Sequence, residues 1–139
     1  MKIFDPKATY NAADDRGVLS YIDLIRQGIQ YKTFLTFANN SPFSINEWSL
    51  FLHLSERTLQ RYEKEKRKFD PLQSEKILEI VLLYKLGISV FGDAHRFHTW
   101  LNTQNLALGN ITPKSLFDSS FGINLLKDEL FRIESGTLA

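Results

Sequence analysis

The chain has 139 residues, of which 43% are hydrophobic and 13% aromatic, enough apolar material for one compact domain or two small helical lobes that share a core. Charged residues make up 24%, a usual share for a folded protein, which argues against disorder. The absence of cysteine excludes disulfides, thiolate nucleophiles and cysteine-bound zinc. The chain shows neither a long apolar run nor a signal-peptide pattern, so we expect a cytoplasmic protein without a membrane partner.

The net charge of +1 conceals a local concentration of positive charge. Within residues 55–68 the basic side chains are Arg57, Arg61, Lys64, Lys66, Arg67 and Lys68, and the acidic ones are Glu56, Glu63 and Glu65. The location of charge matters more than its total for binding a polyanion, so this segment is a candidate contact for nucleic acid.

Apolar residues of the first part of the chain recur at helical spacing, and no strand-like alternation of useful length occurs. We expect a helix over residues 18–27, which Gly28 would end, and a second helix over residues 31–38. A third helix should begin after Ser44, because Ser44 and Glu47 have the spacing of a capping box, in which the two side chains satisfy free backbone N–H groups. Its expected buried stripe is Ile45, Trp48, Phe51 and Leu52.

Two more helices follow. Ser55 is the expected N-cap of a helix that runs to about Lys66, and Pro71 opens a long helix over residues 72–86, since proline is tolerated in the first turn. Apolar residues cover nearly the whole circumference of the long helix: Ile77, Leu78, Ile80, Val81, Leu82, Leu83, Tyr84 and Leu86. Such a helix must be buried on more than one side. It is either the central core helix, which is the simpler interpretation, or a helix that contacts a second lobe or forms part of a dimer interface.

Glycine and proline signals divide the rest of the chain into three helical segments. The expected boundaries are a break at Gly87 and Gly92, a helix over 94–101 capped by Asp93, a loop over 105–110, a short helix over 113–117 after the Thr112 cap, and a last helix over 123–134 between Gly122 and Gly136. The residues expected to face inward from the last helix are Leu125, Leu126, Leu130 and Ile133.

Residues 44–65 have the dimensions of a helix-turn-helix. The second helix of that motif must bury one face while the other remains free to enter a major groove of DNA. With successive residues placed roughly 100° apart around the helix, Leu59 and Tyr62 share the inward face. The opposite arc holds Arg57, Gln60, Arg61, Lys64 and Lys68, and the three glutamates lie outside it.

This arc carries the groups that DNA recognition requires, because arginine suits guanine, glutamine suits adenine and lysine suits phosphate oxygens. The expected DNA-binding residues are Arg57, Thr58, Gln60, Arg61, Lys64, Lys66, Arg67 and Lys68, the last four as phosphate contacts. The alternative interpretation is a solvated helix face that is basic by chance.

The evidence for a catalytic or metal site is weak. His95 and His98 lie three residues apart and Asp93 precedes them, but no third ligand follows at a motif spacing, so polar surface is the simpler interpretation. No phosphate-binding glycine loop, nucleophile elbow or recognisable acid–base pair is present. Trp48 and Trp100 are most simply core or interface anchors. We therefore expect no enzyme activity, no cofactor and no metal.

The expected fold class is all-α: an N-terminal helix-turn-helix lobe, a long connector helix and a small helical C-terminal lobe. The expected divisions are an N-terminal segment over residues 1–16, the helix-turn-helix lobe over 17–70, the connector or core helix over 71–92, and the C-terminal lobe over 93–139.

The last part of the chain contains, in this order, Trp100-Leu101, Asn105-Leu106-Ala107-Leu108-Gly109, Thr112-Pro113 with Leu116, Gly122, and Leu130-Phe131-Arg132-Ile133-Glu134-Ser135-Gly136. In order and spacing these pieces resemble the toxin-binding domain of the Xre/MbcA/ParS antitoxin family. The segment Ser55-Glu56-Arg57-Thr58-Leu59-Gln60-Arg61-Tyr62 is similar to the Xre-type helix-turn-helix that precedes this domain in the family. The resemblance spans roughly residues 17–139. It departs from the family pattern at Phe117-Asp118-Ser119-Ser120, where relatives often carry a second leucine and a threonine.

The resemblance implies the antitoxin of a type II toxin–antitoxin system. Such a protein would neutralise a RES-domain toxin, which consumes NAD, and would bind the operator of its own operon as a homodimer within a larger complex. In the family the C-terminal end lies at the toxin's active-site cleft, which assigns residues 132–139 as the inhibitory segment here. The implied toxin-binding residues are Trp100, Arg132, Glu134, Gly136, Thr137, Leu138 and Ala139. Two alternatives remain: a free-standing helix-turn-helix regulator whose C-terminal lobe only dimerises or senses a ligand, and a small hydrolase or metal enzyme, which has no positive support.

Overall fold

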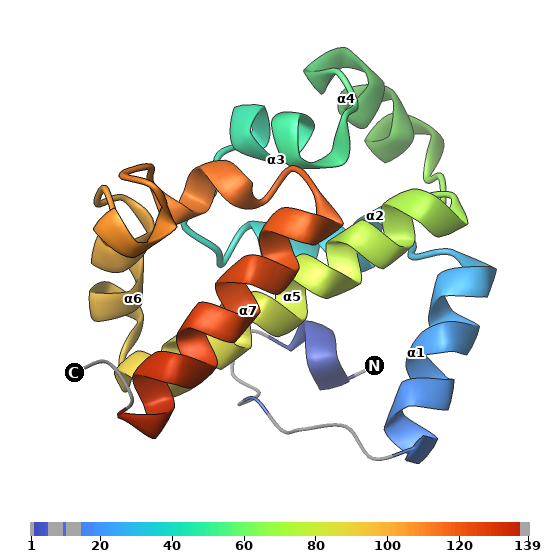
Figure 1. Ribbon diagram of the computed structural model, residues 1–139. Helices are drawn as coiled ribbons and strands as arrows, with labels where there is room; N and C mark the ends of the chain where they lie inside the picture. Colours follow the sequence, from blue (N-terminus) through green and yellow to red (C-terminus); the bar gives the residue numbers. More distant parts are fainter. Residues whose placement is uncertain (1, 6–9, 11–14, 137–139) are drawn as a thin grey trace.

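The computed structural model describes residues 2–5, 10 and 15–136 (Figure 1). All regular elements of these residues are helical, which confirms the expected all-α class. The α-helices are α1 (Asp15–Gln27), α2 (Tyr31–Ala38), α3 (Ile45–Leu52), α4 (Glu56–Glu65), α5 (Pro71–Phe91), α6 (Ala94–Leu101) and α7 (Ser120–Ser135). Short 3-10 helices are η1 (Lys2–Phe4), η2 (Leu106–Leu108) and η3 (Pro113–Leu116). None of the helices in this part of the chain has the length and apolar character needed to span a membrane.

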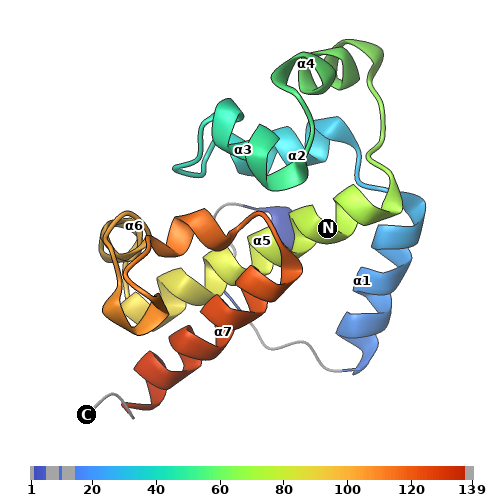
Figure 2. The ribbon, with the colours of Figure 1, turned by 45° about the horizontal axis from the view of Figure 1, so that its top comes forward.

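Helix α5 is the centre of the structure. It packs against α1, α6 and α7, and both ribbon views show it running through the middle of the molecule with α7 beside it (Figures 1 and 2). Its side chains are buried around most of its circumference, as the sequence predicts for a helix without a polar face.

The expected break at Gly87 is wrong, because α5 continues through this residue to Phe91. A Cβ atom at Gly87 would lie 2.1 Å from Cζ of Phe97, so the glycine lets α6 approach α5 closely. Gly92 ends the helix instead, with a φ of 85°.

Side-chain caps fix the starts of α3, α4 and α6 where the sequence predicts them. The capping box of α3 is present: the Ser44 hydroxyl accepts from the Glu47 amide at 3.1 Å, and the Ser44 amide donates to Oε1 of Glu47 at 3.0 Å. The Ser55 side chain caps α4 by accepting from the Thr58 amide, and the Asp93 side chain caps α6 by accepting from the Arg96 amide. These bonds satisfy N–H groups that the first helical turn leaves free, and they need only local sequence.

The start of α7 differs from the expectation. The helix begins at Ser120 because the Ser119 hydroxyl accepts from the Gly122 amide at 3.0 Å. Gly122 lies inside the first turn, where a Cβ atom would be 2.1 Å from the carbonyl oxygen of Leu116. Here too, glycine permits a close approach and does not break the helix.

Two residues expected in the core are exposed. Leu125 is 44% exposed, because Leu126 and Leu130 occupy the buried face of α7 and Leu125 lies about 100° around the helix from Leu126. Ile45 is 39% exposed at the first position of α3, whose buried side is formed by Trp48, Phe51 and Leu52. Other boundary differences are small, such as the start of α1 at Asp15 and the 3-10 helix after Thr112, which ends at Leu116.

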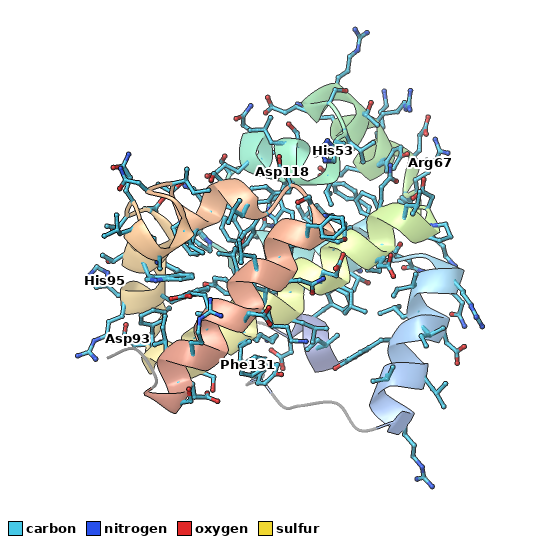
Figure 3. All side chains as sticks on the ribbon, in the orientation of Figure 1. His53, Arg67, Asp93, His95, Asp118 and Phe131 are labelled. Carbon is cyan, nitrogen blue, oxygen red and sulfur yellow. The ribbon has the colours of Figure 1, made fainter. Side chains whose placement is uncertain are left out.

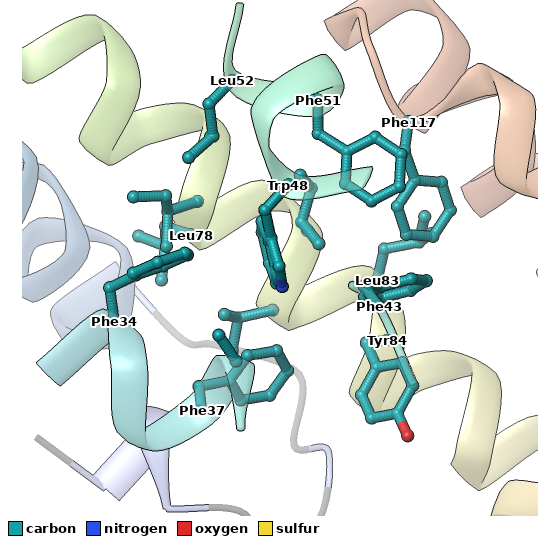
Figure 4. Packing of buried hydrophobic residues seen from close by; sticks show 14 of the residues in the cluster. Phe34, Phe37, Phe43, Trp48, Phe51, Leu52, Leu78, Leu83, Tyr84 and Phe117 are labelled. Atoms are coloured by element: carbon teal, nitrogen blue, oxygen red, sulfur yellow. The ribbon is translucent and has the colours of Figure 1, made fainter. Parts of the chain in front are cut away.

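One aromatic cluster joins the two halves of the chain (Figure 4). The ring of Trp48 lies 5.0 Å from Phe34 and 5.7 Å from Phe43. The ring of Phe43 also lies 5.3 Å from Phe117, which comes from the C-terminal part of the chain. The two lobes expected from the sequence therefore share a single core.

Candidate functional site

Helices α3 and α4 form a helix-turn-helix with a short turn. His53 ends α3 in the left-handed conformation, with a φ of 55°, and the chain reaches the α4 cap Ser55 two residues later. Leu59 is fully buried and Tyr62 is 9% exposed, which confirms the expected inward face of α4. Because α3 and α2 hold this face, the opposite face of α4 points away from the core.

The outward face of α4 is basic and open to solvent. Its exposed side chains, continuing into the segment after the helix, are Arg57, Gln60, Arg61, Lys64, Lys66, Arg67 and Lys68. Thr58 is half-buried, and its hydroxyl accepts from the Ser55 hydroxyl at 2.9 Å. Among the residues that the structure describes, none of these basic side chains forms an ion pair. Both ribbon views show α4 at the edge of the molecule (Figures 1 and 2).

The segment that follows α4 is fixed by backbone hydrogen bonds. The carbonyl of Arg67 accepts from the Tyr31 amide at 3.0 Å, and the Phe69 amide donates to the Ile29 carbonyl at 2.8 Å. The guanidinium of Arg67 lies 4.8 Å from the centre of the Tyr62 ring, a cation–π distance. The basic residues after α4 are therefore held beside the helix.

In the C-terminal part, Trp100 is half-buried in an aromatic stack. Its ring lies 6.0 Å from that of Phe97 and 5.6 Å from that of Phe91. A shallow apolar hollow of about 420 Å³ borders Trp100, Phe91 and Arg96 on the outer side of α6. Trp100 thus serves as a packing anchor and still presents an edge to solvent.

Near the end of α7, Glu129 and Arg132 form an ion pair that the sequence analysis missed. Glu129 is 3% exposed, and its Oε2 accepts from Nε of Arg132 at 3.1 Å and from a terminal guanidinium nitrogen at 2.5 Å. Glu134 is exposed, and Gly136 ends the helix with a φ of 69°. The expected contact residues Thr137, Leu138 and Ala139 lie outside the described residues. The i, i+3 spacing of Glu129 and Arg132 was visible in the sequence, but the burial of Glu129 was not.

The two candidate surfaces lie on different sides of the molecule. In both ribbon views α6 and the C-terminal end of α7 are on the side away from α4 (Figures 1 and 2). A partner at the end of α7 would therefore leave the outward face of α4 accessible.

The histidine pair considered as a metal site has a structural explanation. Nε2 of His98 lies 2.6 Å from the hydroxyl of Tyr84, and the two rings are stacked. Burial lowers the pKa of His98 and raises the pKa of Tyr84. The described residues contain no group of three or more histidine, aspartate or glutamate side chains that could hold a metal ion.

These features define a helical protein in which a helix-turn-helix with a basic outer face is packed against a second, smaller helical domain. Residues 20–82 match the model of the antitoxin Xre-like helix-turn-helix domain, and residues 86–136 match that of the antitoxin Xre/MbcA/ParS C-terminal toxin-binding domain. The chain belongs to the Xre/MbcA/ParS antitoxin family. The resemblance inferred from the sequence motifs is thereby confirmed, and the two matched regions meet within α5.

A curated relative of the chain is also an antitoxin. The chain is similar to Antitoxin Xre of Yersinia enterocolitica serotype O:8 / biotype 1B (strain NCTC 13174 / 8081), with 30% identity over 84 residues. The aligned stretch covers 60% of this chain and 57% of the relative, a little more than half the relative's length.

Proposed function

We propose that this protein is the antitoxin of a type II toxin–antitoxin system, which neutralises a RES-type, NAD-consuming toxin in the cytoplasm and represses its own operon by binding DNA. The observation that carries the proposal is the pairing, in one chain, of an exposed basic recognition helix with a domain of the toxin-binding type on another side of the molecule. It acts by binding and not by catalysis.

DNA recognition is assigned to α4. Its first turns present Arg57, Gln60 and Arg61 outward, and a recognition helix reads bases mainly through its N-terminal residues. Thr58 lies beside them, and Lys64 with the fixed basic segment after the helix would contact phosphates. A homodimer would place two such helices on two half-sites of the operator.

Toxin inhibition is assigned to the C-terminal end. Residues 132–139 would enter the active-site cleft of the toxin and keep its substrate out, with Arg132 and Glu134 at the entrance. The helix stop at Gly136 supports this model, because Gly136 is in the left-handed conformation and ends α7 within the proposed inhibitory segment. Trp100 would contribute a second contact from α6.

Purification of the protein from its native source tests this proposal. We expect a stoichiometric partner whose NAD consumption is suppressed in the complex and returns once the partner is separated. A protein that purifies alone, and whose neighbouring reading frame encodes no toxin that it can neutralise, would instead be a free-standing regulator, and the antitoxin proposal would be wrong.

A further inference from the structure

Helix α3, the first helix of the helix-turn-helix, is held at both ends by one short segment of the C-terminal domain. At its first turn, Oε2 of Glu47 lies 2.6 Å from Nζ of Lys114. At its C-cap, Nε2 of His53 lies 2.7 Å from the carbonyl oxygen of Asp118 (Figure 3). Lys114 belongs to η3, and Asp118 follows η3 before α7 begins.

Between these polar contacts the same segment packs against α3 through an aromatic side chain. Phe117 is fully buried, and its ring centre lies 5.2 Å from that of Phe51 on α3 (Figure 4). It also contacts Phe43, just before the capping box. Residues 114–118 therefore touch the beginning, the last turn and the cap of α3.

The carboxylate of Glu47 takes part in two interactions at once. It caps the Ser44 amide in the capping box and also pairs with Lys114. Burial alone would raise the pKa of Glu47, but hydrogen bonds from Lys114 and Ser44 lower it overall, so the carboxylate stays charged at neutral pH. Lys114 is held from its other side by Oδ1 of Asn102, at 2.7 Å. This chain of contacts runs from the end of α6 to the start of α3.

The position of α4 depends on that of α3. The turn between them is short, and its first residue, His53, is the residue that bonds to Asp118. A shift of α3 relative to the C-terminal domain would therefore move α4 as well. Phe117 is fully buried between these polar contacts, and a close-packed interior leaves few alternative arrangements.

We propose that residues 114–118 of the C-terminal domain position α3, and through it the DNA-reading face of α4, so that Lys114, His53 and Phe117 are positioning residues for operator binding. This inference rests on the proposed DNA-binding function of α4. It makes the toxin-binding domain part of the DNA-binding unit.

Operator binding by full-length variants tests the inference. Lys114→Ala removes the ion pair, Lys114→Arg preserves it, and His53→Asn tolerates the left-handed backbone but is too short to reach Asp118. Lys127→Ala is the matched control, because Lys127 is an exposed lysine on α7 of the same domain. We expect Lys114→Ala and His53→Asn to weaken operator binding roughly fivefold, a size typical of coupling networks, while Lys114→Arg and Lys127→Ala bind like the unmodified protein.

The salt dependence of binding separates positioning from direct contact. A lysine that touches a phosphate contributes about one unit to the slope of log affinity against log salt concentration, so Lys114→Ala should leave the slope unchanged. A slope reduced by about one, or unaltered affinity in both Lys114→Ala and His53→Asn, would overturn the inference. A double variant Arg57→Ala, Arg61→Ala in the same assay identifies the other failure: if its affinity is unaltered, α4 does not read DNA, and the proposed function of α4 falls together with the inference.

Discussion

Glu129 lies buried beneath Arg132, one turn earlier on α7, and its carboxylate accepts two hydrogen bonds from the guanidinium. Arg132 itself is half-exposed. The pair therefore fixes an exposed cationic group close to the end of the helix, where the proposed inhibitory segment begins. A fixed arginine loses less conformational freedom on binding a partner than a free one.

Glu129→Ala should weaken binding of the cognate toxin by roughly twofold to tenfold, because Arg132 loses its fixed orientation and must be ordered when the partner binds. Asp128→Ala, which removes an exposed carboxylate from the neighbouring position, should have little effect. The affinity of purified antitoxin for toxin provides the measurement, with thermal unfolding to confirm that both variants are folded. Equal affinities for the two variants would exclude a role for Glu129 in orienting Arg132.

Deletion of Thr137, Leu138 and Ala139 should weaken inhibition of the toxin by roughly tenfold or more while operator affinity stays unchanged, since few residues dominate a typical interface. Residual NAD consumption at increasing antitoxin concentration measures the effect. If the shortened protein inhibits as well as the full chain, the C-terminal segment does not block the active site.

The double substitution Arg57→Ala, Arg61→Ala should reduce operator affinity by about 1 to 3 kcal/mol for each arginine that contacts a base. Arg16→Ala, Arg96→Ala is the matched control, because it removes the same charge from exposed positions on α1 and α6. Fluorescence anisotropy with labelled operator DNA compares the two. Equal losses in both double variants would mean that only overall charge matters and that α4 has no special role.

Gly87→Ala should destabilise the fold by about 1 to 3 kcal/mol, because the new methyl group would overlap the Phe97 ring. This loss should exceed the gain of about 1 kcal/mol that alanine usually brings to a helix. Ser89→Ala, at an exposed position of the same helix, is the control. Chemical unfolding measures both variants, and a stabilised Gly87→Ala protein would show that α6 is not held closely against α5.

The Tyr84–His98 pair predicts a pH dependence of stability. Burial, followed by the nearby His95, lowers the pKa of His98 below its ordinary value of 6.5, so the folded state favours the neutral ring. The unfolded chain takes up the proton first as the pH falls, and the free energy of unfolding should therefore decline from about pH 7 downward, until the folded state is protonated as well. His98→Gln should flatten this decline, whereas His95→Gln should retain most of it, because burial is the larger cause of the lowered pKa. Urea unfolding between pH 5 and 7.5 provides the measurement, and identical profiles for the two variants would contradict the assignment.

The sequence was sufficient to predict those features of the fold that depend on interactions between residues close together in the chain. The starts of α3, α4 and α6 follow from Ser44, Ser55 and Asp93, whose side chains bond to amides three residues away. The outward face of α4 follows from helical periodicity once Leu59 and Tyr62 are placed inward.

The predictions from the sequence were wrong or incomplete where contacts between distant parts of the chain determine the structure. Gly87 and Gly122 appear as helix breaks in the sequence, but both lie in helices at points where another element comes too close for a Cβ atom. The contacts of Lys114 with Glu47 and of Asp118 with His53 join residues more than sixty positions apart. No local pattern distinguishes such residues from ordinary polar surface, so the contact between the two domains could not be predicted.

Helix α5 carries the end of one matched domain and the start of the next, so no linker separates them. A truncation between the domains would cut through a helix and expose apolar side chains on both fragments. If one domain were exchanged with that of a relative, the two halves of α5 would come from different proteins, and their buried side chains would have to pack together. Substitutions that change the surface of either domain must therefore preserve the packing of this shared helix.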